Sequence, residues 1–480
     1  MNSLFKNSLY YILYRLINVI YPLITATYVS RVLKPAGVGV VALAQNVVIF
    51  LVAVALLGIP NYGVREISKV HGKENDNLFT ELFIINFFST LVISLGYFLV
   101  INSGMLTINR AIYNIYGIIL LLNVINVDWF YQGKEEFKYI TLRSAVVKLL
   151  SVVAIFMFVK NERDVCVYGL IFSSAYAGNY IFNAINLRKH VKLSFDKINV
   201  KKHLSSIFAL AITAISNEIY VTLDTFMLGV FSTNSEIGFY SNSMKLMIIL
   251  INVVTAMGTV ILPRLSILQQ KNDHKSFNNI INRVIKILLW ITVPCTIGII
   301  ILAEPIVIVL FGKDFMPAAE ILKILALLVI PRAFSNMSLQ VLICTKNDTK
   351  TSKVYFTGMV INCVLNVTLI SSLGAIGAAT ASVISEIYIC IVLLYYSKKN
   401  YKFMKNKKFV ISMIVSAIGM LMSVMVIKTT FMDMNFSFLS ILLICIFIGV
   451  FMYCIISLVL KNEVMCFVFF KIRKFLHVEK

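Results

Sequence analysis

Residues 8–58 decide the fold class. They read SLYYILYRLINVIYPLITATYVSRVLKPAGVGVVALAQNVVIFLVAVALLG, two apolar runs of more than 20 residues joined by a turn with Arg31, Lys34 and Pro35. About 20 apolar residues in a helix cross the ~30 Å hydrocarbon core of a bilayer. Lipid offers no partner to backbone N–H and C=O groups, so the helix, which pairs them internally, is the expected structure. The stretch therefore predicts a hairpin of two membrane-spanning helices.

The same pattern recurs along the whole chain of 480 residues, which is 59% hydrophobic with a mean hydropathy of +0.87. A soluble protein of this size would need more polar surface. We therefore predict an all-α integral membrane protein. The first span is expected to be retained, because no cleavage pattern of small residues follows it. The predicted spans number about fourteen: 8–30, 36–58, 79–101, 112–132, 141–159, 164–185, 204–230, 237–262, 284–303, 319–343, 354–372, 374–396, 408–427 and 436–460.

The basic residues lie mainly in alternate connectors. Of the 44 Lys and Arg, 32 fall in the connectors on the side of the N-terminus, seven on the opposite side and five within spans. Cytoplasmic loops of membrane proteins carry this excess of Lys and Arg. We therefore predict a multi-pass protein of the cytoplasmic (inner) membrane with both termini in the cytoplasm. The same distribution argues against a nucleic-acid partner for the net charge of +22, because nucleic-acid binders gather their cations on one soluble face.

Similar turns recur about 200 residues apart. Gly37 and Gly238 are separated by 201 residues, and Arg65 and Arg264 by 199. Short glycine turns also look alike by chance, but six spans separate each pair, so the two copies would have the same orientation. Such parallel repeats are typical of transporters that bind their substrate between two lobes. The predicted domains are an N-terminal lobe at 1–190 (spans one to six), a basic cytoplasmic connector at 191–203, a C-terminal lobe at 204–400 (spans seven to twelve), and spans thirteen and fourteen with a cytoplasmic tail at 401–480.

Several stretches resemble a known family. They are YPLITATYVSRVLKPAGVGVVALAQNVV and GIPNYGVREISK near the N-terminus, DWFYQGKEEFKYITLRS at 128–144, and LDTFMLGVFSTNSEIGFYSNSMKL in the seventh and eighth spans. Together they resemble the Wzx-type polysaccharide and O-antigen flippases, whose superfamily also holds the MATE multidrug exporters and the lipid II flippases. The resemblance implies a MATE-like fold of two six-helix lobes. It also implies movement of undecaprenyl-pyrophosphate-linked oligosaccharides across the membrane for O-antigen, lipopolysaccharide or capsule biosynthesis.

Ionisable residues inside spans are costly and mark candidate functional sites. A cationic set is predicted to line a substrate cavity and bind the lipid pyrophosphate: Arg15, Lys148, Lys245 and Arg332. An acidic set is predicted to bind a coupling H+ or Na+ or to be structural: Glu218, Asp224 and Glu386. In the alternative interpretation these charges pair with each other, for example Arg332 with Glu386, and tie helices together. Lys323, Glu81 and Asp128 lie near an interface and are set aside, because such side chains reach polar surroundings by snorkelling.

Other chemistry is not indicated. The eight cysteines and five histidines show no metal-ligand spacing, and the sequence has no phosphate-binding loop of the GxxxxGK[ST] type. We therefore predict no catalytic residue, metal or cofactor, and a protein that is not an enzyme. The expected partners are the lipid-linked oligosaccharide, membrane lipids and other membrane proteins of polysaccharide assembly. A cation-coupled multidrug antiporter of the same fold is the alternative function, and a membrane-embedded glycan polymerase or glycosyltransferase is a further one.

Overall fold

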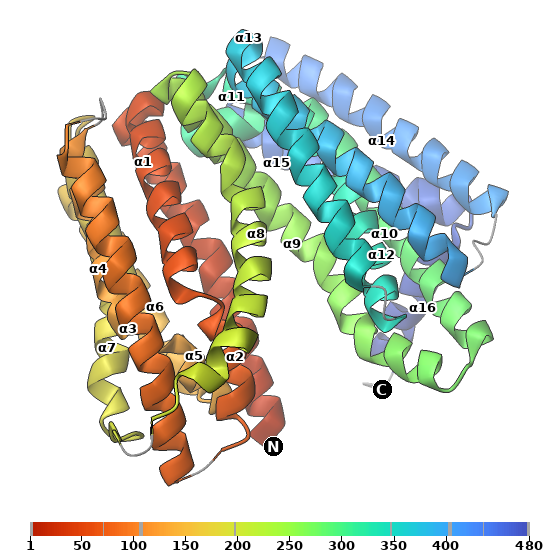
Figure 1. Cartoon of the computed structure of the whole chain (residues 1–480). Coiled ribbons are helices and arrows are strands. Elements are labelled where there is room, and N and C mark those ends of the chain that lie inside the picture. Colours follow the sequence, from red (N-terminus) through yellow and green to blue (C-terminus); the bar gives the residue numbers. More distant parts are fainter. Residues whose placement is uncertain are drawn as a thin grey trace. The chain divides into compact units, whose positions relative to one another are not determined.

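The computed structural model describes residues 3–70, 72–104, 109–195, 198–345, 348–401, 406–434 and 436–477. Within these residues the only regular elements are helices (Figure 1). The chain forms two compact units, Met1–Ser241 (unit 1) and Asn242–Lys480 (unit 2). The predicted all-α membrane fold class is therefore confirmed. The lobe boundaries inferred from the repeat remain a prediction.

Each unit is built from long apolar helices with a few short ones. Unit 1 contains α1 (Ser3–Leu56), α2 (Ile59–Ile67), α3 (Lys73–Asn102), α4 (Arg110–Leu122), η1 (Asn123–Ile125), α5 (Asp128–Gly133), α6 (Phe137–Phe158), α7 (Val165–Leu187) and α8 (Lys201–Phe231). Helix α9 (Asn234–Gln270) begins in unit 1 and continues into unit 2. Unit 2 continues with α10 (His274–Phe311), η2 (Lys313–Phe315), α11 (Ala318–Ala326), α12 (Val329–Cys344), α13 (Asp348–Ser397), η3 (Lys398–Asn400), α14 (Lys407–Asp433), α15 (Phe438–Val459) and α16 (Glu463–His477).

Two helices are each long enough to cross a membrane twice. The apolar part of α1 has 44 residues and that of α13 has 48, which at 1.5 Å per residue is about twice the thickness of a hydrocarbon core. Each is interrupted at one residue, Lys34 in α1 (φ 60°) and Gly374 in α13 (φ 56°). Lys34 precedes Pro35, and the residue before a proline is pushed out of the α-helical region. Gly374 adopts a positive φ without a Cβ penalty. Both breaks lie where the sequence predicted the boundary between two spans.

Within the described residues, nine helices have the length and hydropathy of a membrane span. A tenth is obtained if the two parts of α8, bent by 41° between Ser216 and Glu218, count as one span. The short apolar segment Arg110–Ile125 lies below the length limit. The structure thus shows a multi-pass membrane protein, whereas the number of about fourteen membrane spans remains a prediction.

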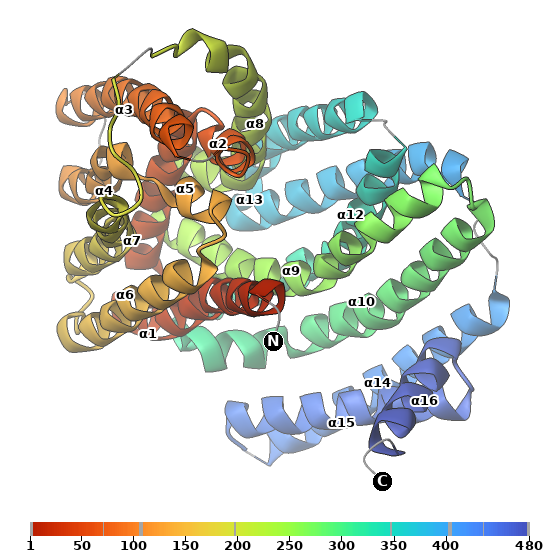
Figure 2. The same ribbon diagram turned by 90° about the horizontal axis from the view of Figure 1, so that it is seen from below.

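Two of the stretches that carry the family resemblance pack against each other at one end of unit 1. Helices α2 and α5 contact each other there, as Figure 2 shows. Gly63 of α2 faces the indole ring of Trp129 in α5 so closely that a Cβ would clash with it. Trp129 in turn stacks on Phe79 of α3, with ring centroids 5.6 Å apart. The sequence stretches 58–69 and 128–144 thus contribute to one aromatic core.

Gly63→Ala is expected to destabilise unit 1 by about 1–3 kcal/mol, the usual cost of overpacking a core. Gly96→Ala is the matched control, because a Cβ at Gly96 meets no atom within 4 Å and alanine is the better helix former. The thermal unfolding midpoints of the purified variants in detergent provide the measurement. Equal midpoints for the two variants would show that the close contact with Trp129 has no energetic weight.

Candidate functional site

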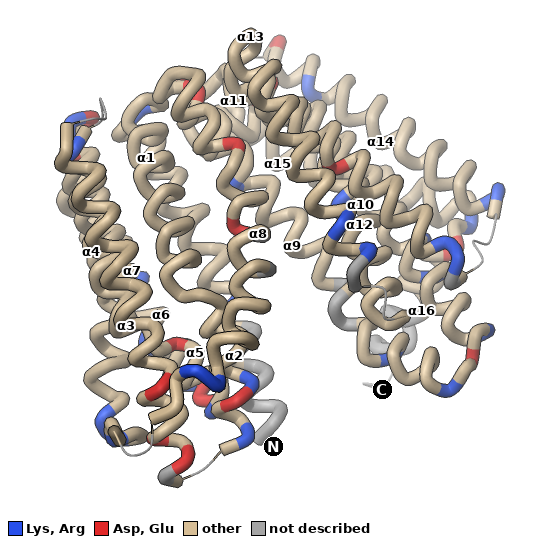
Figure 3. Tube along the Cα trace, viewed as in Figure 1, with Lys and Arg blue, Asp and Glu red and all other residues tan. Residues whose placement is uncertain are grey.

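The predicted site residues lie on the long helices of both units. Figure 3 shows that charged residues in unit 1 gather at the end where α2 and α5 lie and are sparse along the length of the helices. Unit 1 contains four members of the predicted set: Arg15 on α1, Lys148 on α6, and Glu218 and Asp224 on α8. Unit 2 contains the other three: Lys245 on α9, Arg332 on α12 and Glu386 on α13.

Lys148 is held by α1. Its ammonium group donates a hydrogen bond to the side-chain oxygen of Asn18 and lies 5.3 Å from the centroid of the Tyr21 ring. Arg15 is exposed on α1 one helical turn before Asn18, on the same face. Within the described residues, no carboxylate forms an ion pair with Lys148. Its charge is therefore oriented by neutral groups and is not cancelled.

Lys245 of unit 2 has similar surroundings. Its Nζ lies 3.4 Å from the side-chain oxygen of Asn242, one turn earlier on α9. Asn242 is fully buried and Lys245 half-buried. No carboxylate in the described part of the chain forms an ion pair with Lys245. Lys148 in unit 1 and Lys245 in unit 2 thus each contact a side-chain amide and form no ion pair with a described carboxylate.

Arg332 and Glu386 form an ion pair within unit 2, with Nε and Oε2 3.0 Å apart. Glu386 is completely buried, and 27% of the Arg332 side chain is exposed. The pairing named as an alternative in the sequence analysis is therefore present. On the same helix α13, Asn366 donates a hydrogen bond to Asn362 over 3.0 Å, and both are buried. Arg332 accordingly differs from the two lysines, because its charge has a buried counter-ion.

The two acidic residues of α8 differ from each other. Asp224 is buried and accepts a 2.5 Å hydrogen bond from the hydroxyl group of Tyr240. Glu218 lies directly after the bend of α8 and is half-buried. No described residue donates a hydrogen bond to the Glu218 carboxylate or forms an ion pair with it. Of the predicted acidic set, Glu218 is thus the member whose carboxylate is open to an incoming proton or cation.

An ion pair in unit 1 between a buried arginine and a half-buried aspartate was missed by the sequence analysis. Arg143 of α6, with a side chain only 5% exposed, lies 3.1 Å from the carboxylate of Asp128 at the start of α5. It also donates to the side-chain oxygens of Asn179, at 3.1 Å, and Asn183 on α7. The interpretation of Asp128 as a snorkelling residue was wrong, because its carboxylate is bound by Arg143 and Asn183. Asn179 and Asn183, four residues apart on an otherwise apolar span, were the available signal.

A second missed group surrounds Glu81 of α3. Glu81 is only 1% exposed, so its interpretation as a snorkelling residue was also wrong. Its carboxylate lies 2.7 Å from Nε2 of His203 and 2.9 Å from Nζ of Lys202, and it accepts the backbone N–H of Asn199 at 2.7 Å. Nδ1 of His203 lies 2.7 Å from the hydroxyl oxygen of Tyr62 in α2. These contacts fasten the beginning of α8 to α2 and α3.

The segment before α8 is fastened in the same way. We call residues 188–195 the strap. The backbone N–H of Lys192 donates to the carboxylate of Asp76 over 3.2 Å, and that of Ser194 donates to the hydroxyl group of Thr80 over 3.0 Å. Asp76 and Thr80 lie one turn apart on α3, so one face of this helix holds the strap. The predicted connector at 191–203 therefore belongs to unit 1, and its described part is held against α3.

The stretch 58–69, one of those that resemble the known family, ends in a group of three charged side chains outside the long helices. Nε of Arg65 and Nζ of Lys69 lie 2.7 Å and 3.0 Å from the carboxylate of Glu66. Partial burial favours the protonated acid, but the hydrogen bonds from Lys69 and Arg65 outweigh it and hold the pKa of Glu66 below its usual value. Glu66 therefore stays ionised at neutral pH and offsets part of the charge of Arg65.

The fold is that of the MOP superfamily of flippases and exporters. The structure of a lipid II flippase MurJ in an inward closed conformation superimposes with a TM-score of 0.74 over 96% of this chain and 100% of that chain, at 18% identity. An inward-facing MATE multidrug transporter of the MOP superfamily gives a TM-score of 0.65 over 79% of this chain and 93% of that chain, at 13% identity.

The chain belongs to the polysaccharide biosynthesis protein family (Polysacc_synt), whose family model matches residues 4–269. The model of the lipid II flippase MurJ family matches residues 180–469. A putative O-antigen transporter of Escherichia coli (strain K12) is 24% identical over 412 residues, which cover 83% of this chain and 97% of that protein. These findings confirm the predicted Wzx-type flippase of the MOP superfamily, a transporter and not an enzyme.

Proposed function

We propose that this protein moves undecaprenyl-pyrophosphate-linked oligosaccharide repeat units across the cytoplasmic membrane by alternating access, for O-antigen, capsule or a related surface polysaccharide. One observation carries the choice of an anionic lipid substrate. Lys148 and Lys245 are oriented by amide oxygens and have no carboxylate partner within the described residues.

The argument rests on the cost of charge in lipid. A cation within an apolar span costs free energy unless a counter-charge or water compensates it. Arg143 and Arg332 have acidic partners, whereas no described carboxylate pairs with Lys148 or Lys245. Pyrophosphate oxygens would supply the missing charge through short, charge-assisted hydrogen bonds. We assign Lys148 and Lys245, with Arg15 beside Asn18, to binding of the pyrophosphate. Arg332, which is paired with Glu386, is the fourth proposed member of this cationic set.

The same contrast separates this function from its alternative. A drug–cation antiporter needs acidic groups facing its guest, and Asp224 and Glu386 already have partners. Glu218 is the remaining carboxylate, and we assign it to the coupling ion, H+ or Na+. The distribution of Lys and Arg further supports an orientation with both termini in the cytoplasm. The end of unit 1 where α2 and α5 lie would then face the cytoplasm, and the substrate would enter from that side.

Deletion of the gene provides the test. Lipid-linked repeat units should accumulate at the cytoplasmic face of the membrane, and the surface polysaccharide should disappear, because synthesis continues while export stops. Extraction of the lipid-linked oligosaccharides and staining of the surface polysaccharide measure the two effects, and a plasmid copy of the gene is the control. An unchanged surface polysaccharide without accumulation would refute the proposed function.

A further inference from the structure

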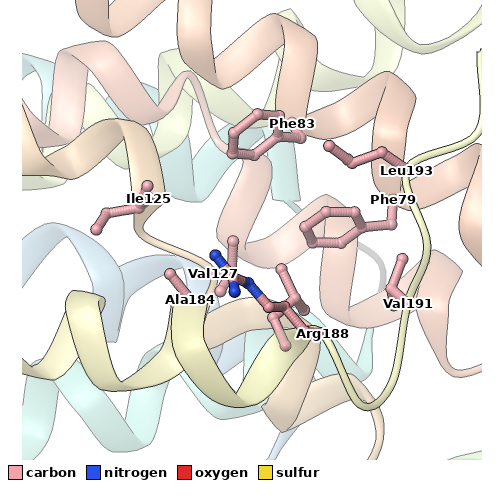
Figure 4. Close-up of a pocket in the computed structure, with 9 residues that line it drawn as sticks. Phe79, Phe83, Ile125, Val127, Ala184, Arg188, Val191 and Leu193 are labelled. Atoms are coloured by element: carbon pink, nitrogen blue, oxygen red, sulfur yellow. The ribbon is translucent and has the colours of Figure 1, made fainter.

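A cavity of about 200 Å³ lies in unit 1 between the ends of α3 and α7 and the strap. Eight of its nine lining residues are apolar, among them Phe79, Phe83, Ile125 and Val127, and the ninth is Arg188 (Figure 4). An apolar cavity of ~150 Å³ in another protein is dry and takes up benzene. The present cavity therefore has the size and lining to accept a piece of hydrocarbon, such as the end of one acyl chain.

The rim of the cavity is cationic. Arg188 is exposed, and Figure 4 shows its guanidinium group on the side of the cavity where Val127 and Ala184 lie. Lys189 and Lys192 are also exposed on the strap. In the described ranges, no carboxylate forms an ion pair with any of these three cations. A planar guanidinium group that faces an apolar cavity without a counter-ion is suited to a phosphate group.

The strap itself has the character of a membrane-interface segment. It exposes Leu193 and Phe195, 55% and 67% accessible, alternating with polar residues. Its position is fixed by the hydrogen bonds from Lys192 and Ser194 to side chains of α3, so the cavity has a preformed wall. Clusters of basic residues next to membrane helices attract anionic lipid headgroups. Hydrocarbon space, unpaired cations and exposed apolar side chains thus occur together on one short segment.

We propose that this cavity binds an anionic glycerophospholipid of the membrane, with the end of one acyl chain in the cavity and the phosphate group on Arg188. The bound lipid would hold the strap, and with it the beginning of α8, against α3 and α7. Neither Lys148 nor Lys245 lines this cavity. The proposal does not rest on the proposed function, since it concerns a lipid that stays bound and not one that is moved.

The charge requirement is tested on the purified full-length chain in uncharged detergent, by native mass spectrometry with added phosphatidylglycerol or phosphatidylcholine. The wild type should retain phosphatidylglycerol in preference to phosphatidylcholine. Arg188→Gln should weaken retention of phosphatidylglycerol about fivefold, the effect expected for one cation near a lipid surface. Lys138→Gln is the matched control, because it removes the same charge from an exposed position of α6 that neither lines the cavity nor lies on the strap. Equal retention of the two lipids, or equal effects of the two variants, would overturn the proposal.

The cavity requirement is tested by filling the space. Ala184→Leu places three further carbon atoms in the cavity and should reduce phosphatidylglycerol retention about tenfold. Val146→Leu, at an exposed position of α6 that does not line the cavity, should leave retention unchanged. The unfolding midpoint without added lipid checks that each variant is folded, and Ala184→Val is a milder second variant. Unchanged retention in both folded Ala184 variants would overturn the proposal. So would displacement of phosphatidylglycerol by an equal concentration of polyprenyl monophosphate, since the occupant would then be a polyprenyl lipid.

Discussion

Charge reversal at Lys245 is expected to abolish the export of surface polysaccharide while the protein remains in the membrane. In Lys245→Glu, a carboxylate replaces the ammonium group beside Asn242 and repels the pyrophosphate instead of binding it. Loss of one charge-assisted hydrogen bond costs about 1.5–3 kcal/mol, so transport should fall at least tenfold, and repulsion adds to this. Complementation of a deletion strain, with immunoblots of the membrane fraction, provides the measurement.

Two further variants make this prediction specific. Lys245→Arg keeps the charge and should retain most of the transport activity. Lys323→Glu is the matched control in unit 2, because the half-buried Lys323 forms a surface ion pair with the exposed Glu320 one turn earlier, a contact worth about 0–1 kcal/mol. Lys148→Glu in unit 1 should behave as Lys245→Glu does. Full complementation by both glutamate variants would remove the two lysines from the proposed binding site.

Arg143→Met is expected to have the largest effect on stability, a loss of about 3 kcal/mol, at the lower end of the usual cost of breaking a buried ion pair because Asp128 is half-buried. The substitution leaves the Asp128 carboxylate without its cation and the oxygens of Asn179 and Asn183 without their donor. The thermal unfolding of the purified protein in detergent gives the measurement.

Lys138→Met is the control for this stability effect. Lys138 is exposed on the same helix α6, and surface substitutions usually change stability by less than about 0.5 kcal/mol. Equal midpoints for Arg143→Met and Lys138→Met would contradict the structural role of the Arg143 group. A transport defect in Arg143→Met without loss of stability would instead indicate contact with the substrate.

The sequence was sufficient for the membrane fold class because apolar length is a local property. It also located the breaks of α1 and α13, since their causes are local. Pro35 disfavours the helical conformation of the residue before it, and Gly374 can adopt a positive φ. The groups around Arg143 and Glu81 could not be predicted in this way. Asp128, Arg143 and Asn183 are distant in the sequence, and only packing of α5, α6 and α7 brings them together.

The candidate site could be predicted only in part, because the sequence gives the position of a charge along a helix but not its partner on another helix. Depth within a span selects Arg332, Lys148 and Lys245 alike, because depth depends only on position along a helix. It does not show that Arg332 has a counter-ion on another helix while the lysines contact amides. The pairing of Arg332 with Glu386 was an open alternative, and deciding it required the packing of α12 on α13.

The one-residue breaks at Lys34 and Gly374 have a consequence for recognition from outside the cell or from the cytoplasm. A turn of a single residue between two spans leaves almost no chain beyond the membrane surface at that point. A protease finds no flexible segment to cut there, and an antibody or a phage finds little to bind. Reporter tags for topology mapping are therefore better inserted elsewhere, because added residues at either break would disturb the tight turn between two helices.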